Sequence, residues 1–586
     1  MNGSIVQESI SANLDDRTMH ELYMWPFANA VRAGVASVMC SYNRINGTYA
    51  CENSKALNGY LKGELGFQGY VMSDWGGTHS GIASVESGLD MNMPGGLGIY
   101  GVTFGLPSYF GGNLTNGVNN GSLEVTRLDD MVIRIMTPYY FLDQDKDFPK
   151  VDPSSADLNT FSPKATWFND WSPILGSERS IDVRGNHAET IRKHAASSTV
   201  LLKNTNASLP LKAPKSIAVF GNDAGDDTQG LLNQQNFEYG TLAAGGGSGT
   251  GRATYIVTPL DAIKVQARKD GSVLQQWLNN TLIAKSHIST LAIPSEPDVC
   301  LVFLKAWAEE AADRHTLDLD WHANEVVESV ASWCSNTVVV THSSGINNLP
   351  FANHPNVTAI LAAHYSGQES GNSIVDVLYG AVNPSGKLPY TIAHNTSDYN
   401  GLPITAVNTT GAYDWQVNFD EKLEIDYRYF DAMNMSVLYE FGFGLSYSTF
   451  ALKDIKIQKV DNSTVSAAPP AQATVPGGNP ALWESLYEVS VRLTNTGAVY
   501  GATVPQLYLS YPESAPAGTP PQQLRGFEKV YLEAGASKTV TFSIMRRDLS
   551  AWDTMSQEWL IPEGSFGVSV GFSSRDFKVT SDVVVV

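Results

Sequence analysis

The sequence of 586 residues contains no uninterrupted apolar run of 18 or more residues, so it offers no obvious membrane-spanning helix. Basic residues are also scarce: 38 Lys and Arg stand against 59 Asp and Glu, which gives a net charge of −21. A nucleic-acid binder that contacts phosphates needs the opposite sign, so we expect neither a nucleic acid nor a membrane as a partner. Hydrophobic residues make up 43%, which excludes a wholly disordered chain, and the length predicts three or four domains.

Cysteine is rare as well, with only Cys40, Cys51, Cys300 and Cys334. Two separated pairs permit two disulfides, and four buried free thiols are the alternative. Asn-X-Ser/Thr sequons are frequent and favour a secretory history. Besides Asn2, they lie at Asn46, Asn113, Asn120, Asn206, Asn279, Asn356, Asn395, Asn408, Asn434 and Asn462. The N-terminus nevertheless lacks the basic and apolar regions of a signal peptide, so we expect the chain to be truncated.

The periodicity of the sequence changes twice along the chain. Apolar runs alternating with helical spacing predict parallel α/β units, and the strict alternation near the C-terminus predicts a β-sandwich. The short runs at 34–40, 70–72 and 89–93 are expected to be strands of the first unit. We therefore predict a multidomain α/β plus all-β chain, divided into an α/β unit (1–140), a linker (141–186), a second α/β domain (187–459), a linker (460–482) and a sandwich (483–586).

The first candidate for catalysis is Asp74, which directly follows the predicted strand 70–72. Loops at the carboxyl ends of parallel strands commonly build active sites, and the adjacent Trp75 offers a flat face for a sugar ring. The alternative is that Asp74 is the N-cap of the next helix. Spacing alone does not decide between these two interpretations.

A second group of acidic residues, Glu309 and Glu310, follows a predicted strand in the second α/β domain. A solvated charged loop is the alternative interpretation. Two carboxylates that meet from two domains would suit glycoside hydrolysis, with one as nucleophile and the other as general acid/base.

Two further patterns are weaker. Residues 244–251 read AGGGSGTG, but they lack the Gly-Lys-Ser/Thr ending of a phosphate loop, so we interpret them as a flexible loop. His315, His322 and Glu325 lack the close spacing of metal ligands, and we expect no metal site.

Ordered motifs along the chain carry a family resemblance. The first part contains Met39-Cys-Ser-Tyr-Asn-Arg-Ile-Asn-Gly, Glu64-Leu-Gly-Phe-Gln-Gly-Tyr-Val-Met-Ser-Asp-Trp and Gly88-Leu-Asp-Met-Asn-Met-Pro-Gly. The second contains Leu201-Leu-Lys-Asn, Leu209-Pro-Leu, Phe220-Gly-Asn-Asp, Gly367-Gln-Glu-Ser-Gly, Asn383-Pro-Ser-Gly-Lys-Leu-Pro, Asp426-Tyr-Arg-Tyr-Phe-Asp and Glu440-Phe-Gly-Phe-Gly-Leu-Ser-Tyr. The tail contains Leu493-Thr-Asn-Thr-Gly and Leu524-Arg-Gly-Phe. This ordered set, which covers nearly the whole chain, resembles the fungal glycoside hydrolase family 3 β-glucosidases.

The resemblance implies a fold and a reaction. The fold would be part of a (β/α)8 barrel, an α/β sandwich domain and a C-terminal fibronectin type III-like domain. The reaction would be retaining hydrolysis of terminal non-reducing β-D-glucosyl residues in cellobiose, cello-oligosaccharides or aryl glucosides, without cofactor or metal. By resemblance, Asp74 matches the nucleophile, Glu310 the acid/base, Tyr42 a tyrosine near the nucleophile and Trp75 an aromatic wall of the sugar site.

The resemblance also implies secretion, with disulfides Cys40–Cys51 and Cys300–Cys334. The chain departs from the family pattern in two places. In the acid/base motif, Ala311 replaces a glycine, which leaves Glu309 as a rival to Glu310. Upstream, one predicted strand precedes that of Asp74, where the family has six, and the Asp, Arg and Lys-His that hold the sugar are missing. We therefore expect residues 1–586 to be inactive as they stand. The alternatives are a β-xylosidase or N-acetylglucosaminidase of the same family, and a non-catalytic carbohydrate-binding remnant.

Overall fold

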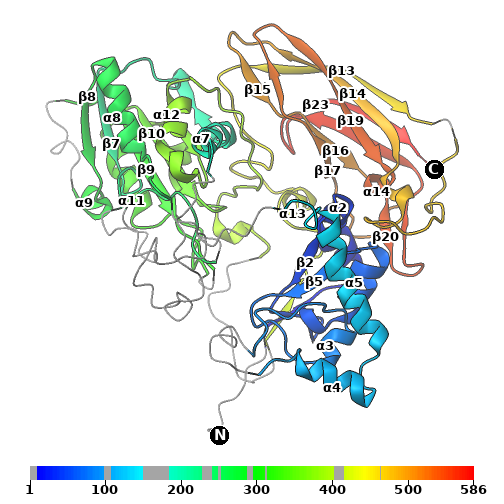
Figure 1. Cartoon of the computed structure of the whole chain (residues 1–586). Coiled ribbons are helices and arrows are strands. Elements are labelled where there is room, and N and C mark those ends of the chain that lie inside the picture. Colours follow the sequence, from blue (N-terminus) through cyan, green and yellow to red (C-terminus); the bar gives the residue numbers. More distant parts are fainter. Residues whose placement is uncertain are drawn as a thin grey trace.

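The computed structural model describes residues 9–97, 107–148, 184–227, 240–248, 253–286, 295–310, 313–401, 415–461 and 463–585. Figure 1 shows an N-terminal part in blue and cyan, an α/β domain in green and a β-sandwich in orange and red, which lies against both. The predicted class, multidomain α/β plus all-β, is confirmed. No helix within the described ranges has the length and apolar character needed to cross a membrane.

The N-terminal part is built around two parallel strands. Strand β2 (Ser37–Cys40) pairs with β5 (Tyr70–Ser73), and the side chains of Val71 and Cys40 lie in the buried core. Around them lie α1 (Asp16–Thr18), η1 (Met19–Tyr23), α2 (Met24–Arg32), η3 (Lys55–Glu64), α3 (Ile82–Glu86), α4 (Gly112–Asn120) and α5 (Val125–Phe141).

The third strand expected at residues 89–93 does not form. Met91 makes only an isolated parallel bridge to Met72. The carboxylate of Asp90 accepts a hydrogen bond from the Val71 backbone at 2.8 Å and also forms ion pairs with Lys62 and Arg127. The Asp90 carboxylate therefore occupies the Val71 N–H that a neighbouring strand would use, and the pairing is limited to a single bridge.

Short strands that the sequence did not predict join distant parts of the chain. Strand β1 (Ser11–Asn13) pairs in parallel with β12 (Gln416–Asn418) and with β3 (Arg44–Ile45). Strand β3 in turn pairs antiparallel with β4 (Thr48–Tyr49). Strands of two or three residues have no periodicity that a sequence reading could detect. This sheet connects the N-terminal part to a segment more than 400 positions away, as the register Ser11↔Gln416 shows.

The α/β domain contains a six-stranded sheet of order β6-β11-β10-β9-β7-β8. Its strands are β6 (Val200–Asn204), β7 (Ser216–Phe220), β8 (Val273–Trp277), β9 (Val299–Ala306), β10 (Thr337–Ser343) and β11 (Val357–Ala362), and only β6 is antiparallel. Helices α7 (His187–Ser198), α8 (Pro259–Asp270) and α12 (Ser370–Leu378) pack on one face, and α9 (Asn280–Lys285) and α11 (Ala323–Ala331) on the other. All eight residues of β9 are buried, as expected for a central strand of a covered parallel sheet.

The sandwich begins earlier than the sequence predicted. Strand β13 (Phe450–Lys459) pairs antiparallel with β14 (Ser485–Asn495) along its length, so the boundary predicted after residue 459 is wrong and lies before Phe450. The strand was missed because it lies at the edge of its sheet, where four of its ten residues are solvent-exposed and only one is buried. The remaining strands are β15 (Gly501–Thr503), β16 (Gln506–Ser510), β17 (Gln523–Phe527), β18 (Val530–Leu532), β19 (Ser537–Met545), β20 (Ala551–Asp553), β21 (Glu558–Leu560), β22 (Ser565–Gly571) and β23 (Phe577–Val584).

The segment predicted as the second linker, 460–482, is also more than a linker. The backbone N–H of Gly477 donates to the Leu65 carbonyl at 2.9 Å, and the segment continues into helix η9 (Pro480–Trp483). Proline, alanine and glycine in this segment predicted a free connection, but the chain packs against the N-terminal part instead. Most of the first predicted linker, 141–186, lies outside the described residues.

Candidate active site

Asp74 lies at the carboxyl end of β5, and its carboxylate is held by two donors. The Tyr42 hydroxyl donates to Asp74 Oδ1 at 2.8 Å, and the Trp75 backbone N–H donates to the same oxygen at 2.6 Å. The next helix, α3, has Gly81 as its N-cap, so the alternative interpretation of Asp74 as a helix cap is wrong. Asp74 is thus a carboxylate oriented by two hydrogen bonds at the carboxyl end of β5, and it does not cap a helix.

Tyr42 lies in the loop that follows β2. A disulfide between Cys40 and Cys51, with Cα atoms 5.2 Å apart, closes this loop. Burial, the hydrogen bond to Asp74 and the negative charges of Asp74 and Glu310 together raise the pKa of Tyr42 to about 12. The phenol therefore stays protonated at neutral pH and remains a hydrogen-bond donor to the carboxylate.

Glu310 comes from the other domain, in the loop after β9. Its Oε2 accepts a hydrogen bond from the Ser248 backbone at 2.6 Å. Hydrogen bonds from the Ser248 side chain and then from the Ser248 backbone lower the pKa of Glu310. The charge of Glu310 also contributes to the raised pKa of Tyr42, so carboxylates from two domains act on one phenol. The rival Glu309 makes a parallel backbone bridge to Gly246 instead.

Trp75 and Tyr42 leave part of their rings uncovered beside Asp74. Their exposed fractions are 40% and 39%. Such faces can stack on a sugar ring at the position where Asp74 would react.

The comparisons with known proteins agree with this arrangement. The Glycosyl hydrolase family 3 N terminal domain matches residues 7–137, its C-terminal domain matches 199–447, and a Fibronectin type III-like domain matches 503–574. "Probable beta-glucosidase G" of Aspergillus flavus is 68% identical over 582 residues, covering 99% of this chain and 71% of that protein. The protein of the same name from Aspergillus terreus is 66% identical over 580 residues, with 98% and 71% covered.

The chain belongs to glycosyl hydrolase family 3. It is therefore a glycoside hydrolase, and its substrate is a carbohydrate. Solved family members have the same fold. A beta-D-glucoside glucohydrolase from Trichoderma reesei has a TM-score of 0.85 at 41% identity, covering 99% of this chain and 77% of that one. A Chaetomium thermophilum beta-glucosidase has a TM-score of 0.88 at 38% identity, with 100% and 78% covered.

The glycine-rich segment is placed differently from the prediction. In its described part, 244–248, the Gly246 N–H donates to the Ala308 carbonyl at 3.1 Å, and the Glu310 N–H donates to the Gly246 carbonyl at 3.3 Å. These residues have no regular secondary structure, as expected of a loop, but they pair with the strand end that carries Glu310. Consecutive glycines are a signal of close backbone approach, and that signal could have indicated the contact.

After Glu310, Arg314 fixes the loop. Its guanidinium donates to the Ile346 carbonyl at 2.9 Å and to Asn347 Oδ1 at 3.0 Å. Arg314 therefore anchors the loop that contains Glu310 to the neighbouring loop after β10.

The candidate metal ligands do not assemble: His322 contacts Glu325 at 3.7 Å, and no group of three possible ligands occurs among the residues that the structure describes.

A Ser-His-Asp arrangement that the sequence did not reveal lies inside the α/β domain. His342 Nδ1 lies 2.5 Å from Asp223 Oδ2, and His342 Nε2 lies 3.2 Å from the Ser370 hydroxyl. All three residues are fully buried, so no substrate can reach the serine. The three side chains instead tie together the ends of β7 and β10 and the start of α12.

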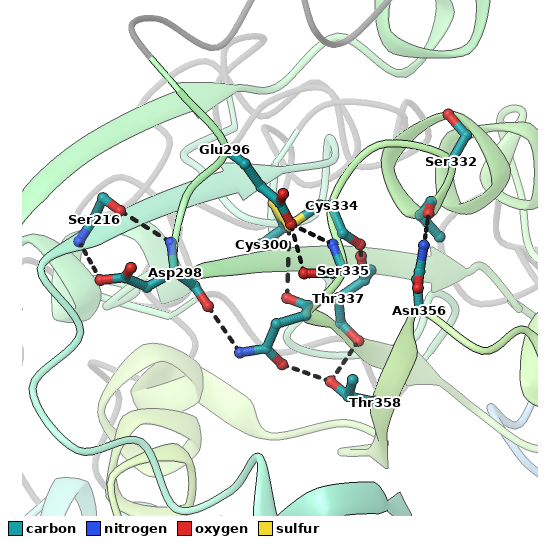
Figure 2. Close-up of a disulfide and its surroundings, with 12 residues drawn as sticks. Ser216, Glu296, Asp298, Cys300, Ser332, Cys334, Ser335, Thr337, Asn356 and Thr358 are labelled. Carbon is teal, nitrogen blue, oxygen red and sulfur yellow. Dashed lines mark hydrogen bonds between the residues drawn. A yellow bond between two sulfur atoms is a disulfide. The ribbon is translucent and has the colours of Figure 1, made fainter.

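The second disulfide, Cys300–Cys334, lies at the other end of the sheet from Glu310. Cys300 is near the start of β9, and Cys334 follows α11, with Cα atoms 6.5 Å apart. Figure 2 shows hydrogen bonds around it, including those that the Ser335 hydroxyl and N–H donate to Glu296 at 2.6 and 2.7 Å. This cluster fixes the amino ends of the strands and has no contact with the candidate catalytic groups.

The sequons differ in their exposure. Asn356 is half-buried, and its amide donates to the Ala331 carbonyl at 2.8 Å, so a glycan there would break an existing contact. Asn408 and Asn462 lie outside the described residues, as does Asn2. The others are exposed: Asn46, Asn113, Asn120, Asn206, Asn279, Asn395 and Asn434.

Proposed function

We propose that this glycoside hydrolase is a retaining β-glucosidase that removes terminal non-reducing β-D-glucosyl residues from cello-oligosaccharides and aryl glucosides. The observation that carries the proposal is the Asp74 carboxylate, which the Tyr42 hydroxyl holds at the end of a parallel strand, together with Glu310 of the second domain, whose charge acts on the same phenol. A carboxylate pair is the chemical requirement of this reaction. Relatives at 68% and 66% identity that are called probable beta-glucosidases support the choice of sugar.

In the first step, Asp74 attacks the anomeric carbon and forms a glycosyl-enzyme ester while the bond to the leaving oxygen breaks. Glu310 gives its proton to that oxygen. In the second step, Glu310 takes a proton from water, and the water oxygen displaces Asp74 from the sugar. Atoms and charges balance over the two steps, and both carboxyl groups return to their starting states.

The hydrogen bonds to Asp74 indicate which oxygen reacts. Those that it accepts from Tyr42 and Trp75 both end on Oδ1, which leaves Oδ2 to face the anomeric carbon. Tyr42 thereby orients the nucleophile, and the exposed ring of Trp75 forms a wall for the sugar. Glu310 is solvent-exposed and has a lowered pKa in the absence of substrate. A bound sugar would exclude water, and this desolvation would raise the pKa towards the value that an acid catalyst needs.

The same proposal places the enzyme outside the cell. The exposed sequons and the two disulfides support this, because N-glycans are added and disulfides form in the secretory pathway.

The test is to measure hydrolysis of an aryl β-glucoside by residues 1–586 and by the same chain fused behind a family-type N-terminal half-barrel. Asp74→Asn is expected to cost several orders of magnitude in turnover, and Glu310→Gln about 10²–10⁴-fold. Azide should partly restore the Glu310→Gln enzyme on a substrate with a good leaving group. Glu309→Gln is the matched control and should keep its activity. If neither protein hydrolyses the glucoside, or if Glu309→Gln is the impaired variant, the proposed roles are wrong.

A further inference from the structure

Gly245, Gly246 and Gly247, followed by Ser248, lie directly against the residues that lead into Glu310. Gly246 and Glu309 form a parallel bridge, with the Gly246 N–H donating to the Ala308 carbonyl at 3.1 Å. The Gly246 carbonyl in turn accepts from the Glu310 N–H at 3.3 Å. A short strand-like pairing thus joins the two loops immediately before the candidate acid/base.

The two backbones approach so closely that only glycine fits. A Cβ on Gly246 would lie 2.4 Å from Trp307 Cζ2 and 2.6 Å from the Glu309 Cβ. A Cβ on Gly247 would lie 2.4 Å from the Glu310 Cβ, and Gly247 also has a φ of +113°, which L side chains rarely adopt. Any side chain at these positions would force the two loops apart.

The close approach brings the Ser248 N–H to the carboxylate. This N–H donates to Glu310 Oε2 at 2.6 Å, a short charge-assisted hydrogen bond. Glu310 is therefore held at two points: at its backbone by Gly246, and at its carboxylate by Ser248. An exposed glutamate has three rotatable side-chain bonds and would otherwise sample many directions.

We propose that Gly245–Ser248 is a backbone clamp that fixes the direction of the Glu310 carboxylate. The inference rests on the proposed function, in which Glu310 is the acid/base, and it makes the clamp a positioning element rather than a catalytic one. The requirement is strict, since a displacement of about 1 Å at a reacting group can cost about a hundredfold in rate. The clamp works through backbone groups, so the glycines are needed for their lack of a side chain.

The contact itself is tested without reference to activity, by hydrogen–deuterium exchange of residues 1–586. Gly247→Ala is compared with Gly271→Ala, a position that also has a positive φ, of +73°, but no atom within 4 Å of its added Cβ. We expect several-fold faster exchange in peptides covering residues 308–310 for Gly247→Ala, and no change there for Gly271→Ala. Gly246→Ala, with Gly345→Ala as its control, repeats the test without left-handed strain. Unchanged exchange at 308–310 in both clamp variants would overturn the inference.

The catalytic consequence is tested on two substrates, using whichever form of the chain hydrolyses them. Phenyl β-glucoside needs a proton on its leaving oxygen, whereas 2,4-dinitrophenyl β-glucoside does not. Gly247→Ala should lose at least about tenfold more turnover on the phenyl substrate, within the range that general acid catalysis supplies, when azide assists the second step. An equal loss on both substrates would show a merely structural role and overturn the inference. Absence of all hydrolysis by the unmutated enzyme would instead contradict the proposed function, and the exchange experiment would still decide the contact.

Discussion

The Tyr42 hydroxyl donates a hydrogen bond of 2.8 Å to Asp74 Oδ1 and so joins the loop after β2 to the end of β5. The Cys40–Cys51 disulfide closes the loop that contains Tyr42, and the Asp74 N–H donates to the Cys40 carbonyl at 3.1 Å. The nucleophile proposed for this glycoside hydrolase is thus fixed through both its backbone and its side chain by one cross-linked loop.

Tyr42→Phe removes the hydroxyl but keeps the ring. A hydrogen bond to a charged group contributes about 1.5–3 kcal/mol, so kcat/KM on an aryl β-glucoside should fall by about tenfold or more. Tyr49→Phe is the control, because Tyr49 lies in the same loop and its ring stacks on His79. Equal activity of Tyr42→Phe and the unmutated enzyme would show that the hydrogen bond does not orient Asp74 in the reaction.

Ser248→Ala should change the pH dependence of the reaction. Hydrogen bonds from the Ser248 side chain and then its backbone lower the pKa of Glu310, and alanine removes only the first of these donors. The pKa of Glu310 should therefore rise. An acid catalyst fails as pH rises through its pKa, so the alkaline limb of kcat/KM for phenyl β-glucoside should move to higher pH. A limb that stays in place, or moves to lower pH, would contradict the assignment.

Asp16 connects the N-terminal part to the sandwich. Its Oδ2 accepts from Trp552 at 2.9 Å and from Gln557 at 2.8 Å, and its Oδ1 from Tyr60 at 2.8 Å. Burial alone would raise the pKa of Asp16, but the hydrogen bonds from Trp552, Gln557, Lys55 and Tyr60 outweigh it and hold the pKa below its ordinary value. The stabilisation is complete above the unfolded pKa of about 3.9, and it declines gradually as pH falls from that value towards the lower pKa of the folded state.

Asp16→Asn should therefore lower the Tm at pH 6 by roughly 2–6 °C, the effect of about 1–2 kcal/mol, and lower it by less at pH 3. The control is Asp454→Asn, since Asp454 and Arg492 form an ion pair with exposed fractions of 54% and 57%. Such exposed pairs contribute little, and no change in Tm is expected at either pH. A loss of stability from Asp16→Asn that is equally large at pH 3 would contradict this account.

The two disulfides should have separable effects. Replacing Cys300 and Cys334 with alanine opens a link that spans 34 positions and should destabilise the α/β domain by about 2–4 kcal/mol, with kcat unchanged. The same change at Cys40 and Cys51 should lower kcat as well, because Tyr42 lies within that loop. Denaturant unfolding and turnover of both double variants give the comparison. A fall in kcat for the Cys300/Cys334 variant would contradict its placement far from the site.

Sequence periodicity predicted the helices and strands that consist of continuous or regularly spaced apolar residues. The sequence predicts a helix at 187–198 and strands at 216–220 and 299–304. Helix α7 and strand β7 have these limits, and β9 extends two residues further, to Ala306. The sequence also placed Asp74 at a strand end, where the structure has it. It failed where the structure depends on distant partners: β1 is three residues long and needs β12, and β13 lies at a sheet edge with many exposed residues.

The candidate site was predictable in its side chains, including Tyr42 and Trp75, but not in its backbone contacts. Motifs indicated Asp74 and Glu310, but the clamp acts through the Gly246 carbonyl and the Ser248 N–H, which every residue type possesses in some form. Only the run of glycines carried information, and it is equally compatible with a flexible loop. The buried Asp223, His342 and Ser370 could not be grouped either, since they come from three separate elements.

The most direct test of the central claim is covalent trapping of the glycosyl-enzyme. The form of the chain that hydrolyses an aryl β-glucoside, residues 1–586 or the half-barrel fusion, is incubated with 2,4-dinitrophenyl 2-deoxy-2-fluoro-β-glucoside. The fluorine slows both steps, and the good leaving group lets the intermediate accumulate. Peptide mass spectrometry is expected to find one fluoroglucosyl group per chain, attached to Asp74, and none in Asp74→Asn. A label on any other residue, or inactivation without a covalent adduct, would contradict the assignment of Asp74 as the nucleophile.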